Sequence, residues 1–180
     1  MLEKILKNKE LIAKILCIVA IALVLPELIS MFNQNFTDNI YSLLLYASYI
    51  GSALYLLILL LRKKELTVKS MIIAVILLFA GLVVTQINNL VEFNNWATVY
   101  YIALYALTII FYLIFAFNNN EKIKIIVYLL FLIVLAFNLT SVFSGSTIGF
   151  ARLILGLIIL TNLYLNSNKE KEEEKLNEEN

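Results

Sequence analysis

Six apolar stretches alternate with short polar connections along this chain, and each is long enough to cross a bilayer as a helix. The stretches cover residues 11–32, 40–61, 68–91, 96–117, 123–143 and 148–165. A membrane-spanning helix needs about 20 predominantly apolar residues, because each residue adds about 1.5 Å. The pattern therefore predicts an all-α polytopic membrane protein, with a single six-helix transmembrane domain over residues 11–165 and short loops.

The composition is typical of a membrane protein and excludes several kinds of functional site. Hydrophobic residues make up 62% of the 180 residues and charged residues only 15%, whereas soluble domains are nearer one half and one quarter. The chain has no histidine, one cysteine (Cys17) and one aspartate (Asp38). It therefore lacks the residues for an internal disulfide, a histidine-containing zinc site, a histidine-based triad or an intramembrane aspartyl dyad. We expect no cofactor and no metal, and an enzyme is the least favoured class.

Basic residues are concentrated on alternate connections. Thirteen of the fourteen Lys and Arg residues lie in the first 14 residues, around the 62–69 connection, around residues 122–124 and in the last 15 residues. Cytoplasmic loops are enriched in Lys and Arg, so both termini are predicted to be cytoplasmic. The Ile-, Lys- and Asn-rich composition favours a bacterial cytoplasmic membrane as the location, and the net charge of +1 gives no argument for nucleic acid.

The two termini differ from the spans between them. Residues 1–10 carry lysines beside a small apolar face, which predicts an amphipathic lead on the inner membrane surface. Residues 166–180 contain almost nothing apolar, so we expect a solvated cytoplasmic tail.

The first span carries two further features. Its small residues recur at helical spacing, a pattern that lets helices approach closely in lipid. This stripe consists of Ala13, Cys17, Ala20 and Val24. Pro26 removes a backbone donor near the outer end, so we expect it to kink or end the regular helix there.

Polar side chains gather in the halves of the spans nearest the predicted outer face. The inner halves are almost entirely hydrocarbon, with Ile76 and Leu130 expected to be buried and only Thr161 and Asn162 interrupting near the inner end. Because unpaired polar groups are costly in lipid, the outer set should turn inward and line a cavity that opens outward. The alternative is scattered interfacial polarity, with amides at headgroup level and hydroxyls bonded to their own helices.

Two charged residues stand out within the spans. Glu27 lies near the outer end of the first span and Arg152 at a similar depth in the sixth. Charges at such depth are costly and are usually paired or functional. We expect the two to form a pair or to line one pocket. The predicted ligand-binding set is Glu27, Arg152, Gln86, Asn88, Asn89, Asn138, Tyr49, Tyr105 and Ser48.

Two function classes follow from this pattern. The first is a membrane protein that binds a small molecule or lipid, as the substrate-binding subunit of a transporter, with a membrane or ATPase subunit as its partner. In architecture alone, six spans and an outward polar cavity resemble the substrate-binding subunits of energy-coupling-factor vitamin transporters, although no sequence motif carries this resemblance. The second class is a non-catalytic accessory or immunity-type protein, which would use the small-residue stripe and the charged tail to contact another membrane protein.

Overall fold

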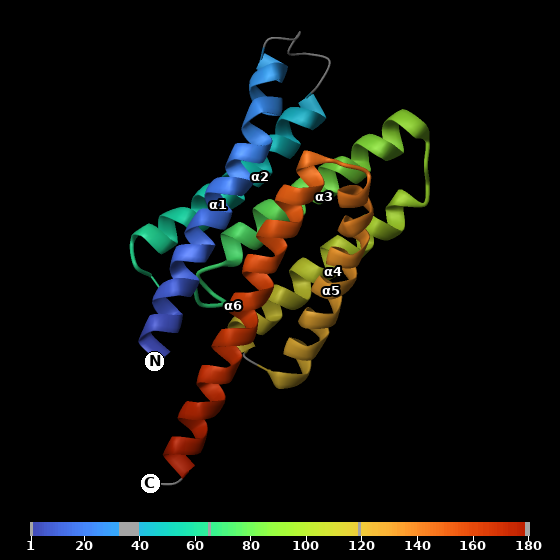
Figure 1. Ribbon diagram of the computed structural model, residues 1–180. Helices are drawn as coiled ribbons and strands as arrows, with labels where there is room; N and C mark the ends of the chain where they lie inside the picture. The colour runs from blue at the N-terminus through green and yellow to red at the C-terminus, as the bar shows by residue number, and fades with distance from the viewer. Residues whose placement is uncertain (1, 33–39, 65, 119, 179–180) are drawn as a thin grey trace.

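The computed structural model describes residues 2–32, 40–64, 66–118 and 120–178, and over these residues the chain forms six α-helices (Figure 1). They are α1 (Leu2–Phe32), α2 (Ile40–Leu61), α3 (Ile72–Phe93), α4 (Thr98–Asn118), α5 (Glu121–Phe143) and α6 (Thr147–Glu178). Each contains a segment long and apolar enough to cross a membrane. The prediction of an all-α fold with six membrane-length helices is therefore confirmed.

Several helix boundaries differ from those expected from hydropathy. The helix predicted from residue 68 begins at Ile72, because residues 67–70 form a turn in which the Ser70 hydroxyl donates to the Thr67 carbonyl at 2.9 Å. The predicted lead is continuous with the first span in α1, and α6 continues well past residue 165. Pro26 does not end α1, which runs on to Phe32. The polar connection 33–39, which includes Asp38, lies outside the described residues.

The helices form a closed ring in chain order. Each helix contacts the next, and α6 closes the ring against α1 while also contacting α2 and α3. Both termini lie at the same end of the bundle, together with the α2–α3 and α4–α5 connections, as an even number of spans requires (Figure 1). Which end faces the cytoplasm stays a prediction from the charge distribution.

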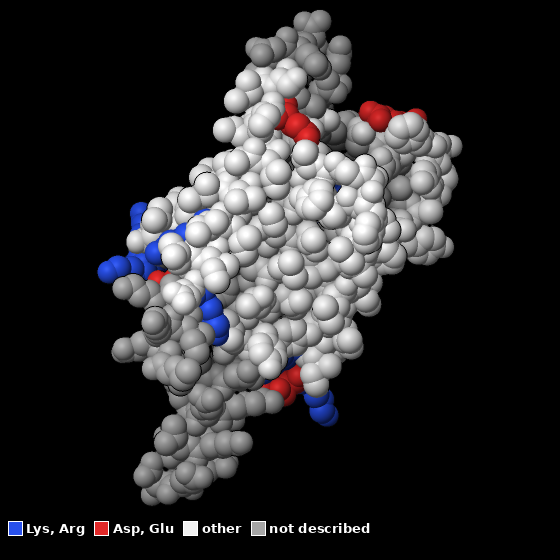
Figure 2. Space-filling model, in the orientation of Figure 1, with Lys and Arg blue, Asp and Glu red and all other residues white. Residues whose placement is uncertain are grey.

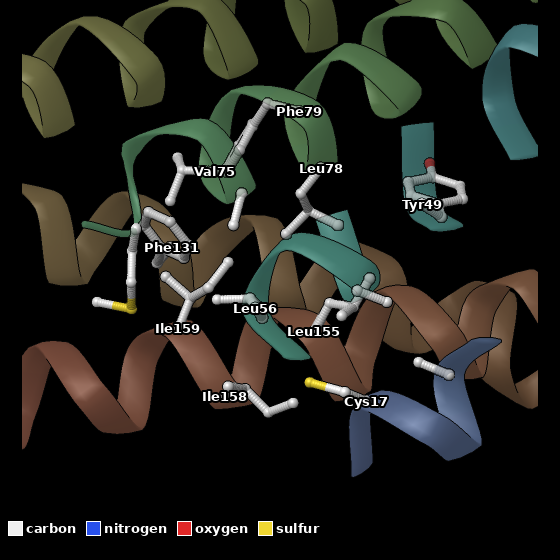
Figure 3. Close-up of a cluster of buried hydrophobic side chains, with 14 of the residues drawn as sticks. Cys17, Tyr49, Leu56, Val75, Leu78, Phe79, Phe131, Leu155, Ile158 and Ile159 are labelled. Carbon is white, nitrogen blue, oxygen red and sulfur yellow. The ribbon is translucent and has the colours of Figure 1, made fainter. Parts of the chain in front are cut away.

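The core joins all of these helices through large apolar side chains (Figure 3). Phe79 of α3 makes edge-to-face contacts with Phe131 of α5 and Tyr105 of α4, at centroid distances of 5.3 and 6.1 Å. From α1, the stripe residues Cys17 and Ala20 are buried in the same cluster. The stripe thus packs inside the bundle and is not an outward contact surface.

The outer surface of the bundle is strongly apolar. Figure 2 shows Lys, Arg, Asp and Glu side chains towards the two ends of the visible face, with a broad band of other residues between them. The expectation that Ile76 is buried was wrong, since its side chain is 40% exposed, and Leu130 is only half-buried. The adjacent Val75 is fully buried instead. In a continuous apolar run, hydropathy gives no signal for the face that turns inward.

Two connections use the same left-handed helix ending. After α2, the amide of Lys64 donates to the Leu59 carbonyl and that of Lys63 to the Leu60 carbonyl, with Lys63 at φ 53°. After α5, Gly145 takes the equivalent position at φ 78°, in the turn before α6. This arrangement satisfies helix-end carbonyls and turns the chain sharply back into the bundle.

Candidate functional site

Glu27 lies where three helices meet near one end of the bundle. It precedes the last residue of α1 by five positions, or about 7.5 Å along the axis. Its carboxylate accepts a hydrogen bond from the Tyr46 hydroxyl of α2 at 2.6 Å, and a second from the Thr147 hydroxyl at the start of α6. Two hydroxyl donors therefore stabilise a carboxylate that would otherwise be costly at this depth.

Arg152 lies at a matching depth on α6, five residues after its first residue. Its Nη2 donates to the Thr85 hydroxyl of α3 at 3.2 Å. Its guanidinium carbon lies 5.1 Å from the ring centroid of Tyr49, on α2. A guanidinium over a tyrosine ring is attracted by the ring's negative face, so Tyr49 supports the cation without bringing a counter-ion.

The two charges share a neighbourhood but form no direct ion pair. No nitrogen–oxygen distance of 4.0 Å or less joins Glu27 to Arg152, both of which are described residues. They are bridged by α2 instead, because Tyr46 and Tyr49 are three positions apart and so lie on one helix face. Of the two expected arrangements, a pair or a shared pocket, the direct ion pair is therefore not formed, and the two charges contact different side chains on the same face of α2.

The hydrogen bonds around Arg152 are incomplete. Its Nε and the Tyr49 hydroxyl are both buried, and neither makes a hydrogen bond of normal geometry. The Tyr49 side chain is 1% exposed, and its hydroxyl lies close to Thr85 and to the guanidinium. Buried donors without partners are rare and costly, and an arginine carries five N–H groups to satisfy. The cluster thus offers two adjacent donors to an acceptor group.

A glycine on α3 allows the Tyr49 ring to reach this position. A Cβ atom on Gly81 would lie 2.6 Å from Cε1 and 2.8 Å from Cζ of Tyr49, which is closer than real contacts allow. The ring therefore lies directly on the backbone of α3, four residues before Thr85. The contact between α2 and α3 at this level thus depends on the absence of a side chain.

The other predicted ligand-binding residues fall into three groups. Tyr105 is buried and lies close to Gln86 and within electrostatic range of Arg152, so these two residues belong to the cluster. Ser48 donates to the Leu44 carbonyl of its own helix, as the alternative interpretation expected for hydroxyls, and the buried Asn138 donates to the Val134 carbonyl of its own helix. Two further amides, Asn88 and Asn89, are half-buried in the last turns of α3.

Three residues of the cluster were absent from the predicted set. Tyr46, Thr85 and Thr147 supply the hydroxyls that contact the two charges. Helical spacing could have indicated Tyr46, three positions before Tyr49. The positions of Thr85 and Thr147 depend on how α3 and α6 pack against their neighbours, so no local pattern reveals them.

The structure contains a hollow at the opposite end of the bundle. This cavity of about 360 Å³ is lined by residues of α1, α6 and the end of α2 with its following turn, among them Leu16, Lys64 and Ile158. The predicted outward-opening cavity around Arg152 stays a prediction. Within the described part of the chain, no group of three or more His, Cys, Asp or Glu residues could hold a metal ion.

The chain matches no known protein family, no curated protein and no solved structure. The structure itself establishes a multi-pass membrane protein with six candidate spans and, near one end of the bundle, a partly buried polar cluster built around Glu27 and Arg152.

Proposed function

We propose that this protein binds a small molecule or lipid carrying an anionic group at Arg152, and that it serves as the substrate-binding subunit of a transporter. The observation that carries the proposal is a pair of buried donors, Arg152 Nε and the Tyr49 hydroxyl, which lie close together and make no hydrogen bond of normal geometry. A carboxylate or phosphate oxygen is the acceptor that such a pair fits best, because charge-assisted hydrogen bonds are about twice as strong as neutral ones.

The electrostatics of the cluster favour an anionic ligand over a neutral one. Glu27 is within the same neighbourhood but accepts hydrogen bonds from Tyr46 and Thr147 instead of neutralising Arg152. The guanidinium therefore keeps its charge available in a medium of low dielectric constant. An arginine at this depth is costly unless something compensates it, and an anionic ligand would do so.

The cluster connects α1, α2, α3 and α6, and a ligand that reaches Arg152 would have to separate these helices locally. Glu27 links α1 to α2 and α6, and Arg152 links α6 to α2 and α3. In this proposal the ligand enters from the predicted outer side, where the polar residues are concentrated, and displaces the contacts of Glu27. Energised transport would come from a partner ATPase subunit. The accessory-protein alternative has less support, because Cys17 and Ala20 of its proposed contact stripe are buried in the core.

A thermal-unfolding screen of the purified protein tests this function. Small carboxylates and phosphate esters should raise the unfolding midpoint, whereas their amide and alcohol analogues should not. Saturation at one hundred times Kd stabilises a protein by about 2.7 kcal/mol. The Tyr49→Phe variant should fold, since an unpartnered buried hydroxyl is removed, and should lose most of the shift.

Tyr128→Phe is the matched control. Its hydroxyl is also buried without a hydrogen-bond partner, but it belongs to α5, away from Arg152. This variant should keep the full ligand-induced shift. The proposal is wrong if no anion stabilises the wild-type protein, or if Tyr49→Phe and Arg152→Gln both keep the wild-type shift.

A further inference from the structure

The hollow at the other end of the bundle has both a charged part and an apolar part. Lys9, seven residues into α1, and Lys64, just after α2, line one part of it. Leu16 and Leu157 line it further along α1 and on α6. Lys9 and Leu16 are seven residues apart on one helix, or about 10 Å along the axis. The hollow thus has the polarity of an amphiphile, with a headgroup region and a hydrocarbon region.

The apolar part of the hollow is accessible from the membrane. Ile12 and Leu157 belong to its lining, and their side chains are 55% and 46% exposed on the hydrocarbon-facing surface of the bundle. Ile158, also in the lining, is 4% exposed and belongs to the core. A lipid chain could therefore enter from the membrane between α1 and α6. A small soluble ion would gain no favourable interaction from this apolar lining.

The charged residues that line the hollow favour a lipid with an anionic headgroup. Its lining contains the cations Lys9 and Lys64 against one carboxylate, Glu10. The exposed Arg62 and Lys63 precede Lys64 on the same connection. Basic pockets between spanning helices on the cytoplasmic side suit anionic headgroups, with about 1 kcal/mol from each Lys or Arg near the surface. Thr161 and Asn162, the two polar residues that interrupt the inner half of α6, add hydrogen-bonding groups to the same lining.

We infer that this hollow binds an anionic phospholipid of the inner leaflet, with its phosphate between Lys9 and Lys64 and an acyl chain against Leu16, Leu60 and Leu157. This site is independent of the cluster around Arg152, since it lies at the opposite end of the bundle and shares no residue with it. A bound lipid would fill the space between α1 and α6.

Native mass spectrometry of the delipidated protein in detergent tests the inference. Phosphatidylglycerol should bind at least tenfold more tightly than phosphatidylcholine with the same acyl chains. The double variant Lys9→Gln, Lys64→Gln should weaken phosphatidylglycerol binding at least tenfold. The control Lys69→Gln, Lys122→Gln removes the same charge from the same end, outside the lining, and should change binding less than threefold.

Two further measurements separate a lipid site from its alternatives. Ala13→Leu fills the apolar part of the hollow without changing charge and should also weaken phosphatidylglycerol binding. If the double variant does not fold, Lys64→Gln alone replaces it, because Lys64 is exposed and lies outside the helices. Equal binding of phosphatidylcholine, equal loss in the control variant, competition by inorganic phosphate, or undiminished binding by Ala13→Leu would each overturn the inference.

Discussion

At the residue scale, the cluster around Arg152 depends on how closely a tyrosine ring can approach a helix backbone. Tyr49 occupies the space that a side chain on Gly81 would need. Gly51, two residues after Tyr49 on α2, is in a different position, since a Cβ atom there would lie at an ordinary 3.4 Å from the Leu77 side chain. The two glycines therefore look alike in the sequence, but only Gly81 lies where a neighbouring side chain leaves no room for a Cβ atom.

This contrast predicts opposite effects of the same substitution. Alanine has a higher helix propensity than glycine by about 1 kcal/mol, so Gly51→Ala should leave stability unchanged or raise it. Gly81→Ala should lower it by about 1–3 kcal/mol, because the buried Tyr49 ring has to move. Thermal unfolding of both variants in detergent measures the difference, and equal stability of the two would contradict the described packing.

At the element scale, α3 organises the core because aromatic side chains from two neighbouring helices converge on it. Phe79 is fully buried and contacts rings of α4 and α5. The hydroxyl of Ser52 on α2 donates to the Ala74 carbonyl of α3 at 2.8 Å. Lipid tails are as apolar as these side chains, so close packing and interhelical hydrogen bonds, rather than burial from water, hold the helices together.

Truncation at two positions of α3, less than one turn apart, tests which face carries this packing. Phe79→Ala should destabilise the protein by about 3–5 kcal/mol, since it opens a cavity between three helices. Ile76→Ala, on the lipid-facing side at 40% exposure, should cost about 1 kcal/mol or less. Reversible unfolding in mixed micelles would measure both values. A larger loss for Ile76→Ala would reverse the assigned orientation of α3.

At the scale of the whole molecule, the two ends of the bundle differ in charge and in shape. One end carries both termini and the lysine-lined hollow, and the other carries the cluster of Glu27 and Arg152. Charge asymmetry of this kind sets orientation in the membrane. The end with the termini is therefore predicted to face the cytoplasm.

Cysteine labelling in intact cells tests the orientation. A membrane-impermeant maleimide should label Asn95→Cys and Ser146→Cys, and should label Lys64→Cys and Asn120→Cys only after permeabilisation. The native Cys17 is fully buried, so its background should be low. Labelling of Lys64→Cys from outside would invert the orientation, and with it the assigned faces of the cluster and the hollow.

The sequence by itself determined the number of spans, the positions of the connections and the charge difference between alternate connections. These are local properties: about 20 apolar residues must cross the bilayer as a helix, and every Lys or Arg except Arg152 lies in or next to a connection or terminus that can be read directly. The sequence also indicated Glu27, Arg152, Tyr49 and Tyr105 as inward-facing polar residues, because polar groups at that depth need partners.

Only the tertiary structure decided which face of each helix turns inward and which hydroxyls form hydrogen bonds with Glu27 and Arg152. In spans that are apolar on every side, a lipid-facing residue such as Ile76, which was predicted to be buried, has the same hydropathy as a buried residue. Thr147 reaches Glu27 because α6 packs against α1, which no spacing along the chain encodes. The hollow has the same origin, since its lining comes from α1, α6 and the end of α2 with its following turn. The packing of the helices, rather than the hydrophobic and polar pattern of the sequence, therefore determines both candidate sites.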